Sequence, residues 1–143
     1  MKHIIMIIDG MGGGIGVQLI SKMKDILDND KDTELIALGT NAVATERMMK
    51  AGAYRGATGE NAIKVSVPLA HFILGPIGIV ITNSMMGEIT PVMVNAILRS
   101  PAERILLPLQ NEHFYLAGLE QLPLSKMMDK GIELFKDRLS QLP

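Results

Sequence analysis

The chain has 143 residues, of which 48% are hydrophobic and 20% charged, and its formal net charge is -1 at pH 7. This length and composition predict one globular domain with a hydrophobic core of its own. The absence of cysteine excludes disulfides, thiolate zinc sites and catalytic thiols. The 14 basic and 15 acidic residues are spread along the chain, so the concentrated positive charge that binds nucleic acid is missing, and no nucleic-acid partner is expected.

Apolar stretches in the sequence are too short for membrane insertion. The first, Ile4 to Ile8, ends at Asp9, and the longest, Phe72 to Ile81, is interrupted by two glycines and a proline. Neither is typical of a signal peptide or a membrane-spanning helix, so we expect a cytoplasmic protein with no membrane partner. Eleven methionines and a mean hydropathy of +0.26 predict that some apolar surface meets another subunit, as in a homodimer.

In chain order, short apolar runs alternate with helical patterns. His3 to Ile8 is a nearly continuous apolar run, which is typical of a strand buried on both faces. From Ile15 to Ile26, apolar residues recur at helical spacing, and Glu34 to Leu38 is a second predicted strand. Asn41 is a suitable N-cap for a helix that ends at Gly52.

The second half continues this alternation. The expected elements are a short helix over Glu60 to Ser66 capped by Thr58, a third strand at His71 to Leu74, a helix from Thr90 and Pro91 to Arg99, a fourth strand at Ile105 to Leu107, and a helix over Leu124 to Leu139. The connection from the fourth strand to His113 is too short for a crossover helix. We therefore predict that His113 to Leu119 is a fifth strand, antiparallel, at the sheet edge.

Strands and helices that alternate in this way predict an α/β fold, a three-layer Rossmann-like sandwich. We expect a mostly parallel five-stranded sheet in the order 2-1-3-4-5, with the last strand antiparallel. In such a sheet, ligands bind at the carboxyl ends of strands 1 and 3, where the strand order reverses. The loops from Asp9 to Gly16 and from Gly75 to Glu88 would then form the site.

The loop from Asp9 to Gly16 reads DGMGGGIG and joins the first strand to the first helix. Glycines let a phosphate approach the backbone, and the free amides of a helix N-terminus favour negative charge. We predict that the loop binds a phosphorylated small molecule, such as a nucleotide or dinucleotide, with Asp9 on a sugar hydroxyl or a cation. A glycine-rich turn without a ligand is the alternative. The expected binding residues are Asp9, Gly10, Gly12, Gly13, Gly14 and Gly16.

Polar residues of two other segments would complete the rim of this site. They are Thr58, Asn61, Asn83 and Ser84. Thr58 and the amides near it can hold an anionic group, while Asn83 and Ser84 can orient a ring-shaped ligand by hydrogen bonds. The alternative for Thr58 and for Ser84 is a purely structural role as a helix cap.

Two acidic residues are candidate catalytic groups. Glu60 or Glu88 could serve as a general base, and carboxylates that converge with Asp9 would shift each other's pKa. The protein would then be a small lyase, isomerase or hydrolase. A third interpretation is a non-catalytic assembly protein in which the glycine turn is structural. None of the three histidines has a neighbour at metal-ligand spacing, so no metal site is predicted.

The G-x-x-x-G-x-G spacing of Gly10, Gly14 and Gly16 resembles the cofactor loop of the short-chain dehydrogenase/reductase family. The chain departs from that family's pattern in three respects. Asp9 replaces the usual small hydroxyl residue, no acidic residue follows the second strand, and no Tyr-x-x-x-Lys pair is present. Hydride transfer by that family's mechanism is therefore not expected.

A wider resemblance rests on four blocks, DGMGGGIG, LGTNAVAT, GATGENAI and GPIGIVITNSMMGEITP. Together they resemble a family of small bacterial proteins known only as a domain of unknown function. The blocks span most of the first two-thirds of the chain. The resemblance implies a Rossmann-like fold and brings no activity, substrate or catalytic residue.

Overall fold

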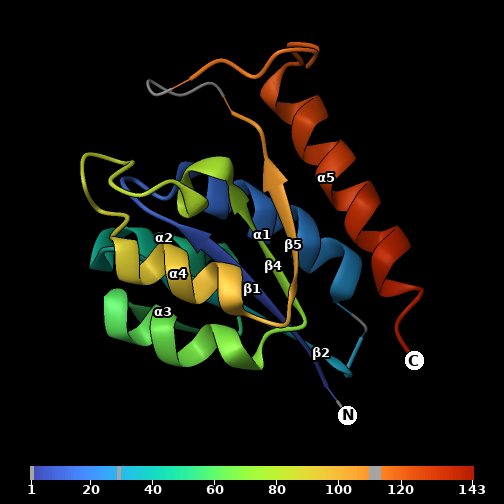
Figure 1. The fold of residues 1–143 in the computed structure, drawn as a ribbon. Helices are drawn as coiled ribbons and strands as arrows, with labels where there is room; N and C mark the ends of the chain where they lie inside the picture. The colour runs from blue at the N-terminus through green and yellow to red at the C-terminus, as the bar shows by residue number, and fades with distance from the viewer. Residues whose placement is uncertain (1, 29, 110–113) are drawn as a thin grey trace.

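The structure is a computed structural model that describes residues 2–28, 30–109 and 114–143. Figure 1 shows one twisted sheet with helices packed on both of its faces. The strands are β1 (His3–Asp9), β2 (Thr33–Gly39), β3 (Arg55–Thr58), β4 (Phe72–Pro76) and β5 (Glu103–Leu107). The helices are α1 (Gly14–Leu27), α2 (Ala42–Ala51), α3 (Glu60–Ser66), α4 (Pro91–Arg99) and α5 (Leu124–Leu139), with short 3-10 turns η1 (Val67–Leu69) and η2 (Ile77–Val80).

The sheet is parallel throughout, in the order β3-β2-β1-β4-β5. The relative order of the four predicted strands that form, β2-β1-β4-β5, is confirmed. The predicted antiparallel edge strand is wrong: residues 114–119 form no strand, and His113 lies outside the described residues. A tight turn, in which the amide of Leu109 donates to the carbonyl of Leu107, leads the chain away from β5 instead.

The fifth strand is β3, at the opposite edge of the sheet. It pairs with β2 in a register that sets Thr58 beside Gly39. Its sequence, RGAT, has only four residues, and three of them are exposed. Neither a buried apolar run nor regular alternation marks it, so the sequence pattern gave no sign of a strand at this point.

The core has two apolar layers, one on each face of the sheet. One layer packs α1, α2 and α5 against the strands, and in it the rings of Phe72 and Phe135 meet edge to face with centroids 5.0 Å apart. The other lies beneath α3 and α4, which share the near side of the sheet in Figure 1. Successive residues of β1 alternate between the two layers. This arrangement confirms the predicted three-layer α/β fold.

Most helix ends follow the predicted signals. The side chain of Asn41 accepts a hydrogen bond from the amide of Ala44 and caps α2, and Gly52 follows that helix with φ 127°. Thr90 caps α4 in the same way. The predicted cap on α3 is wrong, because Thr58 is the last residue of β3 and Gly59 occupies the N-cap position.

The carboxyl ends of the five strands lie along one edge of the sheet because the strands are parallel. The strand order reverses between β1 and β4, which are direct neighbours. A Cβ atom on Gly75, in β4, would overlap the carbonyl oxygen of Ile8 in β1. Glycine at this position therefore permits the close approach of the two strand backbones. Among the described residues, every helix is too short or too polar to cross a membrane.

Candidate functional site

Asp9, the last residue of β1, places its carboxylate against the glycine loop. Its Oδ1 accepts a hydrogen bond from the amide of Gly10 and its Oδ2 one from the amide of Gly16, both at 2.8 Å. Burial raises the pKa of Asp9 above its ordinary value, while these amides and that of Ile15 act to lower it, and the charge of Glu88 adds to the increase. Both carboxylate oxygens of Asp9 therefore accept hydrogen bonds from the loop. The sequence predicted that they would contact a sugar hydroxyl or a cation.

The glycine loop retains part of its predicted anion-binding surface. The amide of Gly13 donates to the carbonyl of Gly10, and Gly13 itself has φ 71°, which turns the chain into α1. For the amides of Gly12 and Gly14, the structure records no acceptor among the described residues, and both glycines are exposed. Among the glycine amides predicted to bind a phosphate, these two therefore remain available to a ligand.

A basic side chain lies beside Gly12, one of the two glycines with an exposed amide. The guanidinium of Arg47, on α2, donates to the carbonyl of Gly12 at 2.6 Å. The loop therefore has a positive charge at Gly12, whose amide donates to neither Asp9 nor Glu88. Sequence reasoning missed Arg47, because its only signal was an ordinary basic residue on the exposed face of a predicted helix.

Glu88 reaches from the loop between η2 and α4 to the carboxyl end of β2. Its Oε1 accepts hydrogen bonds from the hydroxyl of Thr40 at 2.5 Å, from the side-chain amide of Asn41 at 2.8 Å and from the backbone amide of Met11 at 2.9 Å. One carboxylate thus joins three loops at the edge of the sheet. Thr40 and Asn41 were missed as site residues, although a polar pair directly after a buried strand was a signal for them.

The environment of Glu88 holds it in the ionised form. Burial acts to raise the pKa of Glu88, but the hydrogen bonds from Thr40, Met11 and Asn41 together outweigh it, so the pKa lies below its ordinary value. A general base works best when its pKa is near the working pH. A lowered pKa is consistent with a carboxylate that accepts hydrogen bonds, and the general-base role of Glu88 stays a prediction.

Two of the three loops that Glu88 joins, the glycine loop and the loop that carries Glu88, contain strained backbone. Four residues other than glycine have positive φ among the described residues: Met11, Asn83, Met85 and Met86, with φ between 52° and 68°. This left-handed conformation is unfavourable for residues with a side chain, and it tends to accumulate at functional sites. All four lie in the loops on either side of the switch point.

Two predicted rim hydroxyls are used within the protein. Thr58 donates to the hydroxyl of Thr45 at 2.7 Å, which ties the end of β3 to α2. Ser84 is buried and donates to the carbonyl of Gly78, which closes the turn after β4. These two hydrogen bonds give Thr58 and Ser84 a structural role that requires no ligand.

For the remaining predicted residues, the structure records no hydrogen bond to Asp9 or Glu88. Asn83 is exposed in the Glu88 loop, while Glu60 and Asn61 are exposed in the first turn of α3. The structure records no contact of Glu60 with Asp9 or Glu88, so the predicted convergence of three acids is limited to the last two. In the part of the chain that the structure describes, no group of three metal-ligating side chains is placed to hold a metal ion.

The fold and this edge of the sheet define the class of protein: a parallel α/β protein of the Rossmann type, with a glycine loop at its switch point. The chain matches the model of the family described as a domain of unknown function (DUF3842) over residues 4–140, and it belongs to that family. This agrees with the resemblance that the sequence blocks indicated. No curated protein and no solved structure matches the chain.

Proposed function

We propose that the protein binds a nucleotide, with its phosphate on the glycine loop and its ribose hydroxyls on Glu88. The position of Glu88 is the observation that carries this proposal. In Rossmann-type nucleotide sites, an acidic residue at the end of the second strand accepts the ribose hydroxyls, while the first loop holds the phosphate. This sequence has no acid directly after β2, but the carboxylate of Glu88 lies there, held by Thr40 and Asn41.

The phosphate would lie over the amides of Gly12 and Gly14. These amides belong to the start of α1, where the helix dipole favours negative charge. Arg47 contacts Gly12 and supplies the positive charge that a phosphate needs. A phosphate nearer to Gly10 would meet the charges of Asp9 and Glu88, which disfavours that position. Asn83, exposed in the same loop as Glu88, would contact the base.

Melting temperatures measured with a panel of nucleotides test the proposal. We expect AMP, ADP and NAD to stabilise the protein, because a ligand that binds only the folded state raises its melting temperature. NADP should stabilise it less, since the phosphate on its ribose 2′-oxygen would face the carboxylate of Glu88. The variant Glu88→Gln should lose this preference for NAD. A panel in which no nucleotide changes the melting temperature would refute the proposal.

A pair of variants on α2 tests the phosphate half of the site. Arg47→Gln removes the cation beside Gly12 and should weaken nucleotide binding about tenfold, the effect of losing one charged hydrogen bond. Lys50→Gln is the matched control, because Lys50 is exposed on the same helix and pairs with Glu46 rather than with the loop. Equal affinities of the two variants in calorimetric titrations would contradict the placement of the phosphate.

A further inference from the structure

Among the described residues, the sheet ends at β5, which pairs with β4 alone and has an open outer edge. The amide of Glu103 donates to the carbonyl of His71, toward β4. Because successive amides of a strand point to opposite sides, Arg104 and Leu106 direct theirs toward the outer edge. An open edge of this kind is a template for pairing with another strand.

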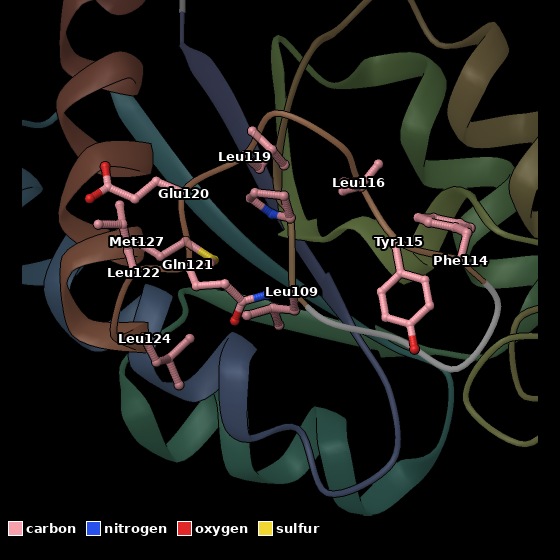
Figure 2. Close-up of a pocket in the computed structure, with 11 residues that line it drawn as sticks. Leu109, Phe114, Tyr115, Leu116, Leu119, Glu120, Gln121, Leu122, Leu124 and Met127 are labelled. Carbon is pink, nitrogen blue, oxygen red and sulfur yellow. The ribbon is translucent and has the colours of Figure 1, made fainter.

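Apolar side chains are exposed around this edge. They come from the segment 114–122, which connects β5 to α5, and from α5 itself. Tyr115 is 92% exposed, Leu119 52% and Leu134 50%. Two hollows, of about 250 Å³ and 300 Å³, lie along this segment. Figure 2 shows the first, which is lined mostly by apolar residues including Leu109, Leu116 and Met127.

The exposed apolar side chains supply more than half of the area that a subunit interface requires. Five side chains, Phe114, Tyr115, Leu116, Leu119 and Leu134, together expose on the order of 500 Å², if each large side chain has about 200 Å² of surface. The largest apolar patch on a typical monomer is about 300 to 600 Å², and is often functional. A stable complex buries about 800 Å² of each partner. The five side chains and the backbone edge of β5 together approach that area.

We propose that two copies of this chain pair through β5 about a twofold axis, so that their sheets join into one. A twofold axis through Ile105 sets Arg104 of each copy opposite Leu106 of the other. Both residues direct their amides outward, so each pair exchanges two main-chain hydrogen bonds. In this register no like charges face each other, whereas a shift that centres the axis on Arg104 would set two guanidinium groups together. Leu134 and the segment 114–122 then cover the joined strands.

The other edge of the sheet shows why β5 is the strand that pairs. β3 has only four residues, and one of them is glycine. Arg55 at its start is exposed and forms an ion pair with Glu34 at 3.0 Å. Short, charged edge strands resist pairing with another sheet. β5 instead ends in the apolar run Ile105 to Leu107.

Molar mass in solution tests the dimer. Size-exclusion chromatography with light scattering should give twice the chain mass of 15.5 kDa for the full chain. Leu134→Lys should reduce the mass to that of one chain, because a buried charge would have no partner in the interface. Leu98→Lys is the matched control, since Leu98 is 52% exposed on α4, over the other face of the sheet, and this variant should stay dimeric. A wild-type chain that is monomeric at millimolar concentration, or two variants that are equally dimeric, would overturn the proposal.

Hydrogen exchange on the wild-type chain gives a second test, which needs no substitution and so cannot be confused by an unfolded variant. The amides of Arg104 and Leu106 should exchange more slowly in concentrated than in dilute solution, by a factor that follows the fraction of dimer. The edge amides of β3 serve as the internal control and should not respond to concentration. Unchanged exchange at Arg104 and Leu106 over a concentration range in which light scattering shows the dimer dissociating would exclude this interface.

Discussion

The glycine loop after β1 and the segment 114–122 after β5 both follow the carboxyl ends of strands. They differ in how far the chain itself satisfies their exposed groups. In the glycine loop, two carboxylates of the chain accept the amides of Gly10, Met11 and Gly16. The segment 114–122 instead exposes large apolar side chains beside two hollows. A loop with its own acceptors is organised before any ligand arrives, whereas the segment leaves apolar area for a second protein surface to cover.

The largest expected effect lies beneath the glycine loop. Gly75→Ala should lower the free energy of unfolding by about 3 kcal/mol, because the new methyl group would overlap the carbonyl of Ile8 in the neighbouring strand. Gly14→Ala is the control: a Cβ on Gly14 meets nothing within 4 Å, and the stability should change by less than about 1 kcal/mol. Urea denaturation measures both. Similar losses in the two variants would show that this edge is less tightly packed than its geometry indicates.

An intermediate effect is expected at Glu88, and it should depend on pH. A pKa that is lowered in the folded state means that the ionised carboxylate stabilises the fold above its ordinary pKa of 4.5, and that this contribution is lost as the pH falls through the lower folded value. Glu88→Gln should therefore cost about 2 kcal/mol at neutral pH. The difference from the wild type should disappear in acid.

The control for the Glu88 experiment is internal. Asp9 has a raised pKa, so its ionisation reduces stability as the pH rises through that value, the opposite direction to Glu88. Because Asp9 is present in both proteins, its effect largely cancels in the difference between them. A difference that stays constant from neutral pH to strong acid would contradict the hydrogen bonding of an ionised Glu88.

The smallest effect is expected in the segment 114–122. Tyr115→Ser should change the stability of the isolated chain by less than about 0.5 kcal/mol, because the side chain is 92% exposed. If two copies cover this segment, the loss should increase with protein concentration. Thermal melts at several concentrations measure this. A large loss in dilute solution would show that Tyr115 belongs to the fold of the single chain.

Much of the fold was predictable because its signals are local. The buried run of β1, the proline and threonine at the start of α4 and the apolar stripe of α5 each lie within one short window of sequence. The edges of the sheet were not predictable in the same way. β3 has no apolar pattern of its own. The apolar residues 114–119 resemble a strand, although no strand of the described ranges pairs with them.

The candidate site was only half predictable for a similar reason. The glycine spacing marked the loop, and Glu88 was recognisable as an acid near the switch point. The partners of Glu88 were not, because Met11, Thr40 and Asn41 lie 77, 48 and 47 residues away along the chain. Arg47 likewise reaches Gly12 across 35 residues. Such contacts depend on the strand order, and no local pattern encodes them.

The contact between Phe72 and Phe135 has a consequence for synthesis of the protein. β1 to β5 are complete by Leu107, yet the layer over Phe72 is completed by the ring of Phe135, which lies in α5. During translation, the apolar face of β4 is therefore not fully covered until Phe135 has left the ribosome. A chain that stops before Leu124 would present that face to its neighbours, and aggregation is the expected fate of such a fragment.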